Sequence, residues 1–303
     1  MTNTSVVPNK KRNKRNSVKN TLSGWFLIIP TLLLFVLIVW RPILMSIRYS
    51  FYDLKGFEPT GFVGFKNYIE VLTDTNFIKT LGNTVKYVVW SLLIGFPLPF
   101  IVAIMINEMI KTKGLFKFVT YLPVIIPGIA NYLIWKFIYA DGAGGLLNMF
   151  LDFMGIGPME WLSNSVLSIP LVIIAVTWQG FGSTTILYLA SLQGVDQSLY
   201  EAAQLDGAGI FTRIKTVLFP HMYGILILNF VRQIITVFQI TEQPMVMTGG
   251  GPNGATMSLG FTNYYYAFKY SQFDRSMALG VITFVLLIGL TFVYFKIDRK
   301  INS

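Results

Sequence analysis

The sequence has no cysteine and a single histidine among its 303 residues. The absence of cysteine excludes a disulfide framework, a thiolate nucleophile and a cysteine-based metal site, and one histidine is too few for an ordinary zinc or haem site. Charged residues are also scarce, at 13%, while 53% of the chain is hydrophobic. A typical soluble domain has about 25% charged residues. This composition argues against a soluble enzyme, and also against a disordered chain, which would be poor in apolar and aromatic residues.

The few charges are mostly basic, and their position matters more than their number. A net charge of +10 fits either nucleic acid or an anionic membrane surface. Residues 1–24 carry six Lys or Arg residues, no acid precedes Asp53, and an apolar run from Trp25 to Trp40 follows at once and continues to Met45. No small-residue cleavage site follows the run, so a retained membrane helix is predicted rather than a signal peptide. A nucleic-acid arm remains an alternative for the basic tail, but a polybasic segment beside a membrane helix is usually an orientation signal.

Long apolar stretches recur along the whole chain. About 20 apolar residues are needed to cross the hydrocarbon of a bilayer, and such a stretch must be helical because lipid offers the backbone no hydrogen-bond partner. Pro97 and Pro99 predict kinks in the second stretch, and Pro123 and Pro127 in the third. The sequence therefore predicts an all-α polytopic membrane protein whose first helix is followed by five more, at roughly 84–106, 118–139, 166–192, 221–240 and 277–295.

The connections between these helices differ in their Lys and Arg content. The connections 107–117 and 193–220 contain Lys or Arg residues, as do both chain ends, whereas 140–165 has acids and no Lys or Arg. Because basic segments stay in the cytoplasm, both termini and the second and fourth connections are predicted to be cytoplasmic. We divide the chain into a basic tail, 1–22, and a six-span domain, 23–303.

The connection between the fourth and fifth spans has a distinct local pattern. Ser198 and Glu201 have the spacing of a capping box, which predicts a helix beginning at Ser198. Asp206-Gly207 predicts a turn, since glycine accepts a positive φ. Pro220 is predicted to begin the next membrane helix, where its missing N–H costs little. The pattern by itself indicates two short helices and fits a capped amphipathic connector with no special role.

Glu201-Ala202-Ala203, then Gly207 after three residues, then Val217-Leu-Phe-Pro220 resemble the EAA loop of binding-protein-dependent ABC importer permeases. We place this loop at about 196–220. The family usually has Ile and Leu where this chain has Val217 and Phe219, and both positions stay apolar. Other segments resemble MalF/UgpA-like sugar permeases in particular: Pro30-Thr31, Ser50-Phe51, Val63-Gly-Phe-Lys-Asn-Tyr68, Asn83-Thr84 and Thr248-Gly-Gly-Gly-Pro252. The resemblance covers about residues 22–300 and implies the MalF-like fold of type I ABC importers.

The resemblance also implies partners and roles. It implies a bacterial plasma (inner) membrane subunit that works with a second, MalG-like permease, an ABC ATPase dimer and an extracytoplasmic solute-binding protein that delivers a sugar. The chain itself has no catalytic residue, metal or cofactor in this scheme, because ATP and Mg²⁺ bind to the ATPases. Glu201 then contacts the ATPase, or is only a helix cap. The residues implied in coupling to the ATPase are Glu201, Ala202, Ala203, Asp206, Gly207 and Pro220.

Polar residues within the fourth and fifth spans suggest a solute pathway. Asn229, Gln233 and Thr236 are spaced i, i+4 and i+7, which places them on one helix face, with Arg232 and Gln239 on a strip beside it. Polar side chains in a membrane tend to face the bundle or a wet pathway, although polar packing between helices is the alternative. The resemblance places the solute in the spans flanking the loop, and the predicted positions are Gln179, Gly180, Ser183, Asn229, Gln233 and Thr236.

Other functions remain open at this point. The chain could be the same kind of permease for another solute, such as glycerol phosphate. A phosphorylated solute would need several positive groups near the pathway, and only Arg232 lies deep within a predicted span. An ion-coupled carrier usually places acids within its spans, and an intramembrane enzyme needs a catalytic constellation, which the spacing does not suggest. Thr248–Gly254 lacks the Gly-Lys-Ser/Thr ending of a phosphate loop, and is expected to be a tight turn or a contact with the binding protein.

Overall fold

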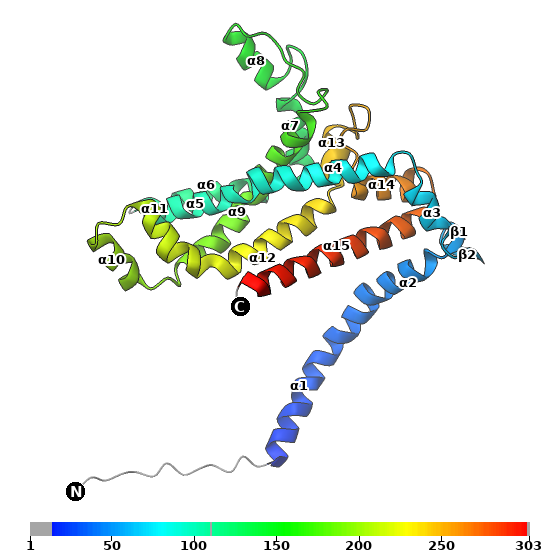
Figure 1. The fold of residues 1–303 in the computed structure, drawn as a ribbon, viewed down its shortest axis with the longest axis horizontal. Coiled ribbons are helices and arrows are strands. Elements are labelled where there is room, and N and C mark those ends of the chain that lie inside the picture. The colour runs from blue at the N-terminus through cyan, green and yellow to red at the C-terminus, as the bar shows by residue number, and fades with distance from the viewer. Residues whose placement is uncertain (1–13, 110, 302–303) are drawn as a thin grey trace.

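The computed structural model describes residues 14–109 and 111–301, which are almost entirely helical (Figure 1). The main elements are α1 (Lys14–Phe35), α2 (Arg41–Tyr49), β1 (Tyr52–Lys55), β2 (Glu58–Phe62), α3 (Lys66–Leu72), α4 (Phe77–Trp90), α5 (Pro97–Glu108), α6 (Lys113–Ile125), α7 (Gly128–Ile138), α8 (Leu146–Phe153), α9 (Ser168–Leu192), α10 (Gln197–Leu205), α11 (Ile210–Arg213), α12 (Phe219–Phe238), α13 (Glu242–Met247), α14 (Leu259–Tyr264) and α15 (Phe273–Ile301). Four π-helical turns join some of them: η1 (Val36–Trp40), η2 (Ser91–Gly95), η3 (Ile214–Leu218) and η4 (Tyr265–Lys269).

Five of the six predicted spans are confirmed as helices of suitable length and composition. The first α-helix begins at Lys14, within the segment predicted as a tail, and residues 1–13 of that tail lie outside the described residues. Four of these five helices are longer than the predicted spans, and the fifth, Ser168–Leu192, begins two residues later than predicted. Their bounds are Gly24–Tyr49, Phe77–Glu108, Ser168–Leu192, Ile210–Phe238 and Phe273–Lys296.

The third predicted span, 118–139, is not a straight helix. It consists of α6 and α7, which meet at an angle of 95°, so that α7 leads away from the bundle (Figure 1). The break follows from Pro127, because the residue before a proline is driven out of the helical region: Ile126 has φ −70° and ψ 128°. The kink predicted from Pro127 is confirmed, whereas Pro123 stays inside α6.

Three of the π-helical turns end two residues before a proline: Pro42, Pro97 and Pro220. In a regular helix the proline ring collides with the carbonyl four residues back. In each of these turns the N–H just before the proline bonds five residues back, as from Phe96 to the Ser91 carbonyl at 2.9 Å. The wider turn lets the helix continue past the proline. α12 begins at Phe219 with Pro220 in its first turn, as predicted, and α11 and η3 extend the continuous helix back to Ile210.

α9 is the central helix of the bundle. It contacts α4, α5, α6, α7 and α12, and Val172, Ile173, Ala175 and Tyr188 on it are fully buried. A helix that is apolar on every side is expected in a bundle interior. The helices around it therefore position any site that its side chains form.

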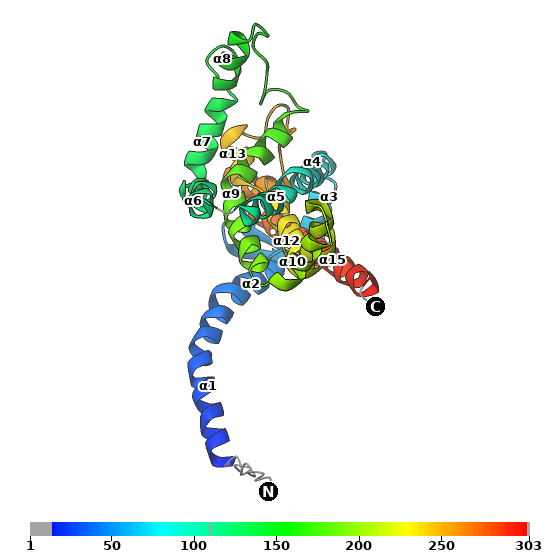
Figure 2. The ribbon, with the colours of Figure 1, turned by 90° about the vertical axis from the view of Figure 1, so that its left-hand side faces the viewer.

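The first span stands apart from this bundle. None of its most apolar stretch is buried, and α1 runs away from the other helices in two perpendicular views (Figures 1 and 2). Its C-terminal part, α2, packs on α15 and β1. The span thus leaves a long apolar surface, including Trp25 and Phe26, without cover from the rest of the described chain.

A short antiparallel hairpin, β1–β2, follows the first span and was not predicted. The turn uses Gly56 at φ +64°. Next to it, the Asn67 amide donates to the carbonyls of Ser50 and Tyr52, both at 3.0 Å, and the Tyr68 and Ser50 hydroxyls are 2.6 Å apart. These bonds join two segments that carry the family resemblance and give them a shared structural role.

Gly182 sets how closely α6 and α9 approach. A Cβ at this position would lie 2.2 Å from the Thr120 carbonyl oxygen. Gly182→Ala is expected to lower the thermal stability of the detergent-solubilised protein, because overpacking costs about 1–3 kcal/mol. Gly180→Ala is the matched control, since a Cβ there meets nothing within 4 Å. Equal melting temperatures for the two variants would contradict this account of the packing.

Candidate functional site

A polar cavity of 190 Å³ lies between α9, α12 and the η2–α5 segment. It brings together five of the six predicted pathway residues, which come from two spans separated by the α10 loop. Gly95, at the end of η2, closes one side, because a Cβ there would lie 3.0 Å from both Gln233 Nε2 and Thr177 Oγ1. The predicted residues that line the cavity are Gly180, Ser183, Asn229, Gln233 and Thr236.

The hydrogen-bonding capacity of this cavity is only partly used. Asn229 and Ser183 donate to carbonyls of their own helices, at 2.9 Å each. Within residues 14–109 and 111–301, the side chains of Arg232, Gln233 and Thr236 make no hydrogen bond or ion pair. Arg232 lines the same cavity. Amide, hydroxyl and guanidinium donors are thus free to bind a polar solute.

Tyr188 adds an aromatic side to the cavity. Its ring packs edge-on against Phe100, with centroids 6.1 Å apart, and its hydroxyl is buried without a hydrogen-bond partner. A buried unpaired hydroxyl is costly. A solute hydroxyl or a water within reach of the Tyr188 hydroxyl would remove that cost.

The sixth predicted pathway residue, Gln179, lies elsewhere. Its amide nitrogen donates to the Ile126 carbonyl at 3.1 Å, and its oxygen is 3.4 Å from Asn131 Nδ2. Gln179 therefore braces the α6–α7 break, where a carbonyl has lost its helical partner. The structure does not place this residue on the cavity.

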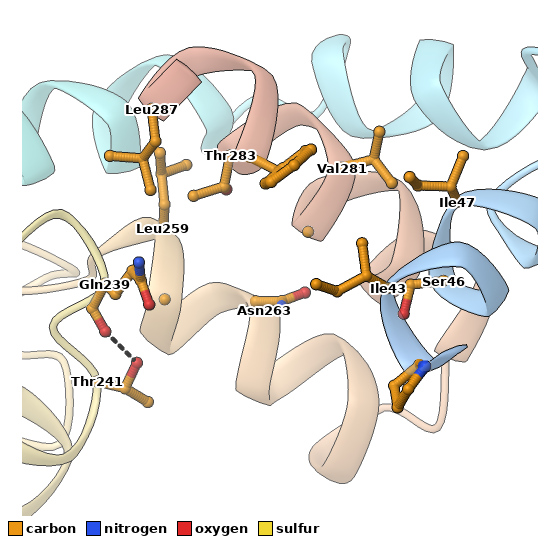
Figure 3. Close-up of a pocket in the computed structure, with 14 residues that line it drawn as sticks. Ile43, Ser46, Ile47, Gln239, Thr241, Leu259, Asn263, Val281, Thr283 and Leu287 are labelled. Atoms are coloured by element: carbon orange, nitrogen blue, oxygen red, sulfur yellow. Dashed lines mark hydrogen bonds between the residues drawn. The ribbon is translucent and has the colours of Figure 1, made fainter. Parts of the chain in front are cut away.

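A second, larger cavity of 470 Å³ lies between α2, α14 and α15, and sequence analysis did not find it (Figure 3). Ile43 and Ile47 of α2 line one side, and Leu287 of α15 lines another. Gln239 belongs to this cavity, so the predicted strip of Arg232 and Gln239 is divided between two cavities. Its residues come from four distant segments, and no local sequence pattern marks them as neighbours.

The loop between α9 and α12 has mostly exposed residues. α10 ends at Leu205, Gly207 follows with a φ of +79°, and the Ala208 N–H donates to the Ala203 carbonyl at 3.0 Å. This is the helix ending that a left-handed glycine provides, so the predicted turn is confirmed. Glu201 and Ala202 are exposed. Leu205 and Phe211, at 88% and 84% exposed, add apolar surface beside them.

The start of α10 differs from the prediction. The helix begins at Gln197, and the cap is Asp196, whose carboxylate accepts from the Ser198 N–H at 2.9 Å and the Ser198 hydroxyl at 2.7 Å. These bonds lower the pKa of Asp196. Ser198 is therefore a donor to the cap and not the cap itself, because a carboxylate is the stronger acceptor for the free N–H groups of a first turn.

The glycine-rich segment Thr248–Gly254 lies at the opposite end of the bundle from α10 (Figure 1). Gly249 and Gly250 have φ of +60° and +89°, which a tight turn requires. The Asn83 amide donates to the carbonyls of Gly254 and Met257, at 2.9 and 3.0 Å. The turn is thus fastened to the start of the second span.

No group of three His, Asp or Glu side chains suited to a metal ion occurs in the described part of the chain. The chemistry available at the polar cavity is hydrogen bonding and one positive charge. This suits binding and passage of a solute.

Residues 95–303 match the family described as binding-protein-dependent transport system inner membrane component. The chain is 30% identical over 277 residues to the trehalose/maltose transport system permease protein MalF of Thermococcus litoralis, covering 91% of this chain and 93% of that protein. It is 29% identical to the multiple sugar-binding transport system permease protein MsmF of Streptococcus mutans, over 93% and 97% of the two chains. The lactose transport system permease protein LacF of Rhizobium radiobacter is 28% identical over 94% and 98%.

A similar fold occurs in a crystal structure of a bacterial ABC transporter involved in the import of the acidic polysaccharide alginate. The TM-score is 0.83 at 20% identity, covering 95% of this chain and 99% of that chain. A second structure of an alginate transporter, in complex with an alginate pentasaccharide-bound periplasmic protein, gives the same TM-score at 22% identity.

Proposed function

The chain belongs to the family of binding-protein-dependent transport system inner membrane components, and from this membership we propose that it is the permease subunit of an ATP-driven importer for a sugar or oligosaccharide. The observation that carries the proposal is the pairing of a polar cavity with an exposed loop, since the same two helices, α9 and α12, form the cavity and flank the loop. Relatives named for trehalose/maltose, multiple sugars and lactose support a carbohydrate as the solute.

The loop is proposed to couple an ATPase dimer to the spans. Glu201, Ala202 and Ala203 would face the ATPase, with Asp206 and Gly207 setting the turn and Pro220 the entry into the long part of α12. The exposed Leu205 and Phe211 support a protein partner at this surface, because large apolar residues flanked by polar ones mark interaction sites. The α10 end, with both termini, is accordingly proposed to be cytoplasmic.

The uncovered first span supports a second permease, MalG-like, as a partner. Its apolar surface could face lipid alone, but α1 runs away from the other helices (Figure 2), and this uncovered surface is available to an apolar helix of a partner. An external solute-binding protein would meet the opposite end, where Thr248–Gly254 lies. In this proposal ATP and Mg²⁺ bind to the ATPases, and the chain is non-catalytic.

Arg232 allows a test of the solute's charge. Uptake of a neutral sugar by Arg232→Gln is expected to change by less than about fivefold, because an exposed charge contributes little to a neutral contact. An anionic solute would lose about tenfold or more, since charge-assisted bonds are stronger. Arg232→Lys keeps the charge and is the control. A large loss in the glutamine variant that lysine prevents would contradict a neutral solute and favour one such as glycerol phosphate.

The proposal as a whole is tested by purifying the tagged chain from native membranes in mild detergent and identifying its companions by mass spectrometry. A second permease and an ATPase are expected. The complex in liposomes should take up a sugar only when both ATP and the binding protein are supplied. Uptake by the chain alone, without ATP, would overturn the proposal in favour of an ion-coupled carrier.

A further inference from the structure

Three side chains from three elements meet beneath α10. Glu108 is the last residue of α5, Tyr200 lies in α10, and Arg213 ends α11. The Tyr200 hydroxyl donates to Glu108 Oε1, and Arg213 Nη1 is 3.9 Å from Glu108 Oε2. The Arg213 guanidinium also lies over the Tyr200 ring, 4.8 Å from its centroid. We call these three residues the Glu108 cluster.

The Glu108 cluster is partly buried. The side chains of Arg213 and Glu108 are 14% and 25% exposed, so their charges are screened less than those of a surface pair. Burial, and then the neighbouring Glu108, raise the pKa of Tyr200 to about 12. The hydroxyl therefore keeps its proton and donates to Glu108 throughout the physiological range.

The cluster joins α10 to a helix that the backbone does not reach directly. α10 is joined by the backbone to α9 on one side and, through α11 and η3, to α12 on the other, and none of residues 198–205 is buried. Glu108 adds a link to α5, which contributes Pro99, together with Phe96 just before it, to the wall of the polar cavity. A displacement of α10 can thus reach the cavity through a third helix.

The contact geometry leaves room for a tighter arrangement. Arg213 Nε is buried without an acceptor, and its Nη1 is farther from Glu108 than a hydrogen bond would place it. A guanidinium and a carboxylate can form two parallel bonds. A small shift of α11 relative to α5 would therefore change the strength of the link.

We propose that Glu108, Tyr200 and Arg213 are positioning residues that transmit movement of α10 to α5 and so to the wall of the solute cavity. This inference rests on the proposed coupling role of the loop. The inference adds which side chains connect α10 to α5, and the proposed role of the loop does not specify them.

The test uses the complete importer in liposomes and measures solute taken up per ATP hydrolysed. Tyr200→Phe keeps the ring beneath Arg213 but removes the bond to Glu108, and is expected to lower this ratio at least about threefold while ATP hydrolysis continues. Tyr264→Phe, at a 39% exposed tyrosine outside the cluster, should leave it unchanged. Glu108→Lys should lower the ratio further, and combining it with Arg213→Glu should restore part of it.

The subunit composition of each purified variant complex is the control. A variant that has lost a subunit has a folding or assembly defect, whereas a complete complex with a lower ratio has a coupling defect. An unchanged ratio in both Tyr200→Phe and Glu108→Lys, in a complex that still transports, overturns the inference and leaves the proposed function intact. Failure of the wild-type complex to need ATP would instead overturn the proposed function.

Discussion

Gly207→Pro is expected to abolish solute uptake by the assembled importer while the chain still inserts into the membrane. Gly207 has φ +79°, and proline fixes φ near −65°. The substitution also removes the Gly207 N–H that bonds to the Gln204 carbonyl at 3.1 Å. α10 would then end in another direction, and the surface proposed to meet the ATPase would be lost. Uptake in liposomes, with membrane content measured by immunoblot, tests this.

Gly209 provides the control for that experiment. It lies two residues further along, with φ −62° and ψ 165°, which any residue can adopt, and a Cβ there meets nothing within 4 Å. Gly209→Ala should transport normally. Normal uptake by Gly207→Pro would show that the direction of α10 does not matter for transport and would remove the main support for coupling through this loop.

Gly180→Leu is expected to block uptake almost completely while ATP hydrolysis continues. Gly180 lines the polar cavity, and nothing lies within 4 Å of a Cβ at this position. The Cβ of a leucine would therefore meet no neighbour, and the rest of the side chain is expected to extend into the cavity of 190 Å³. The solute would lose both space and polar contacts. Uptake and ATP hydrolysis measured on the same liposomes distinguish a blocked solute pathway from a loss of ATPase activity.

Gly224→Leu is the matched control for the cavity. Gly224 lies on α12, also has open space around a Cβ, and does not line the cavity. Both substitutions replace a helical glycine by a better helix former, so effects on helix stability should be similar. Wild-type uptake by Gly180→Leu would exclude this cavity from the pathway.

The spans could be predicted from sequence because each is set by its own composition. A run of apolar residues must be helical in lipid, whatever its neighbours are. The turn at Gly207 was predictable for a similar reason, since one residue type accepts its backbone conformation. The same holds for the break at Pro127. What these features share is that the cause lies within a few residues of the effect.

The candidate site was only partly predictable, because it depends on which helix faces meet. Gln233 and Thr236 share a face of α12, and the structure brings that face to the cavity. Gln179 is one residue from Gly180 but faces α6, where the Ile126 carbonyl needs a donor. That need arises from the 95° break, which no pattern around Gln179 reveals.

The start of α10 and the Glu108 cluster could not be predicted from the sequence, for two different reasons. Ser198 and Asp196 both satisfy sequence rules for a cap, and the competition is decided by acceptor strength. Glu108 and Tyr200 are 92 positions apart, so their contact follows from the packing of α5 beneath the loop. A tyrosine and a glutamate in separate connections carry no signal of it.

The π-helical turns before Pro42, Pro97 and Pro220 have a consequence for how each span presents its side chains. A turn closed five residues back instead of four holds one extra residue, and each residue advances a helix by about 100°. The side chains before and after the turn are therefore out of phase. In the second span, α4 and α5 both contact α9, but α4 also contacts α12 and α14 whereas α5 also contacts α6, although the helix is continuous. One helix can thus direct one row of side chains toward the bundle core before the turn. After the turn, it can direct a differently oriented row toward the cavity and the Glu108 cluster.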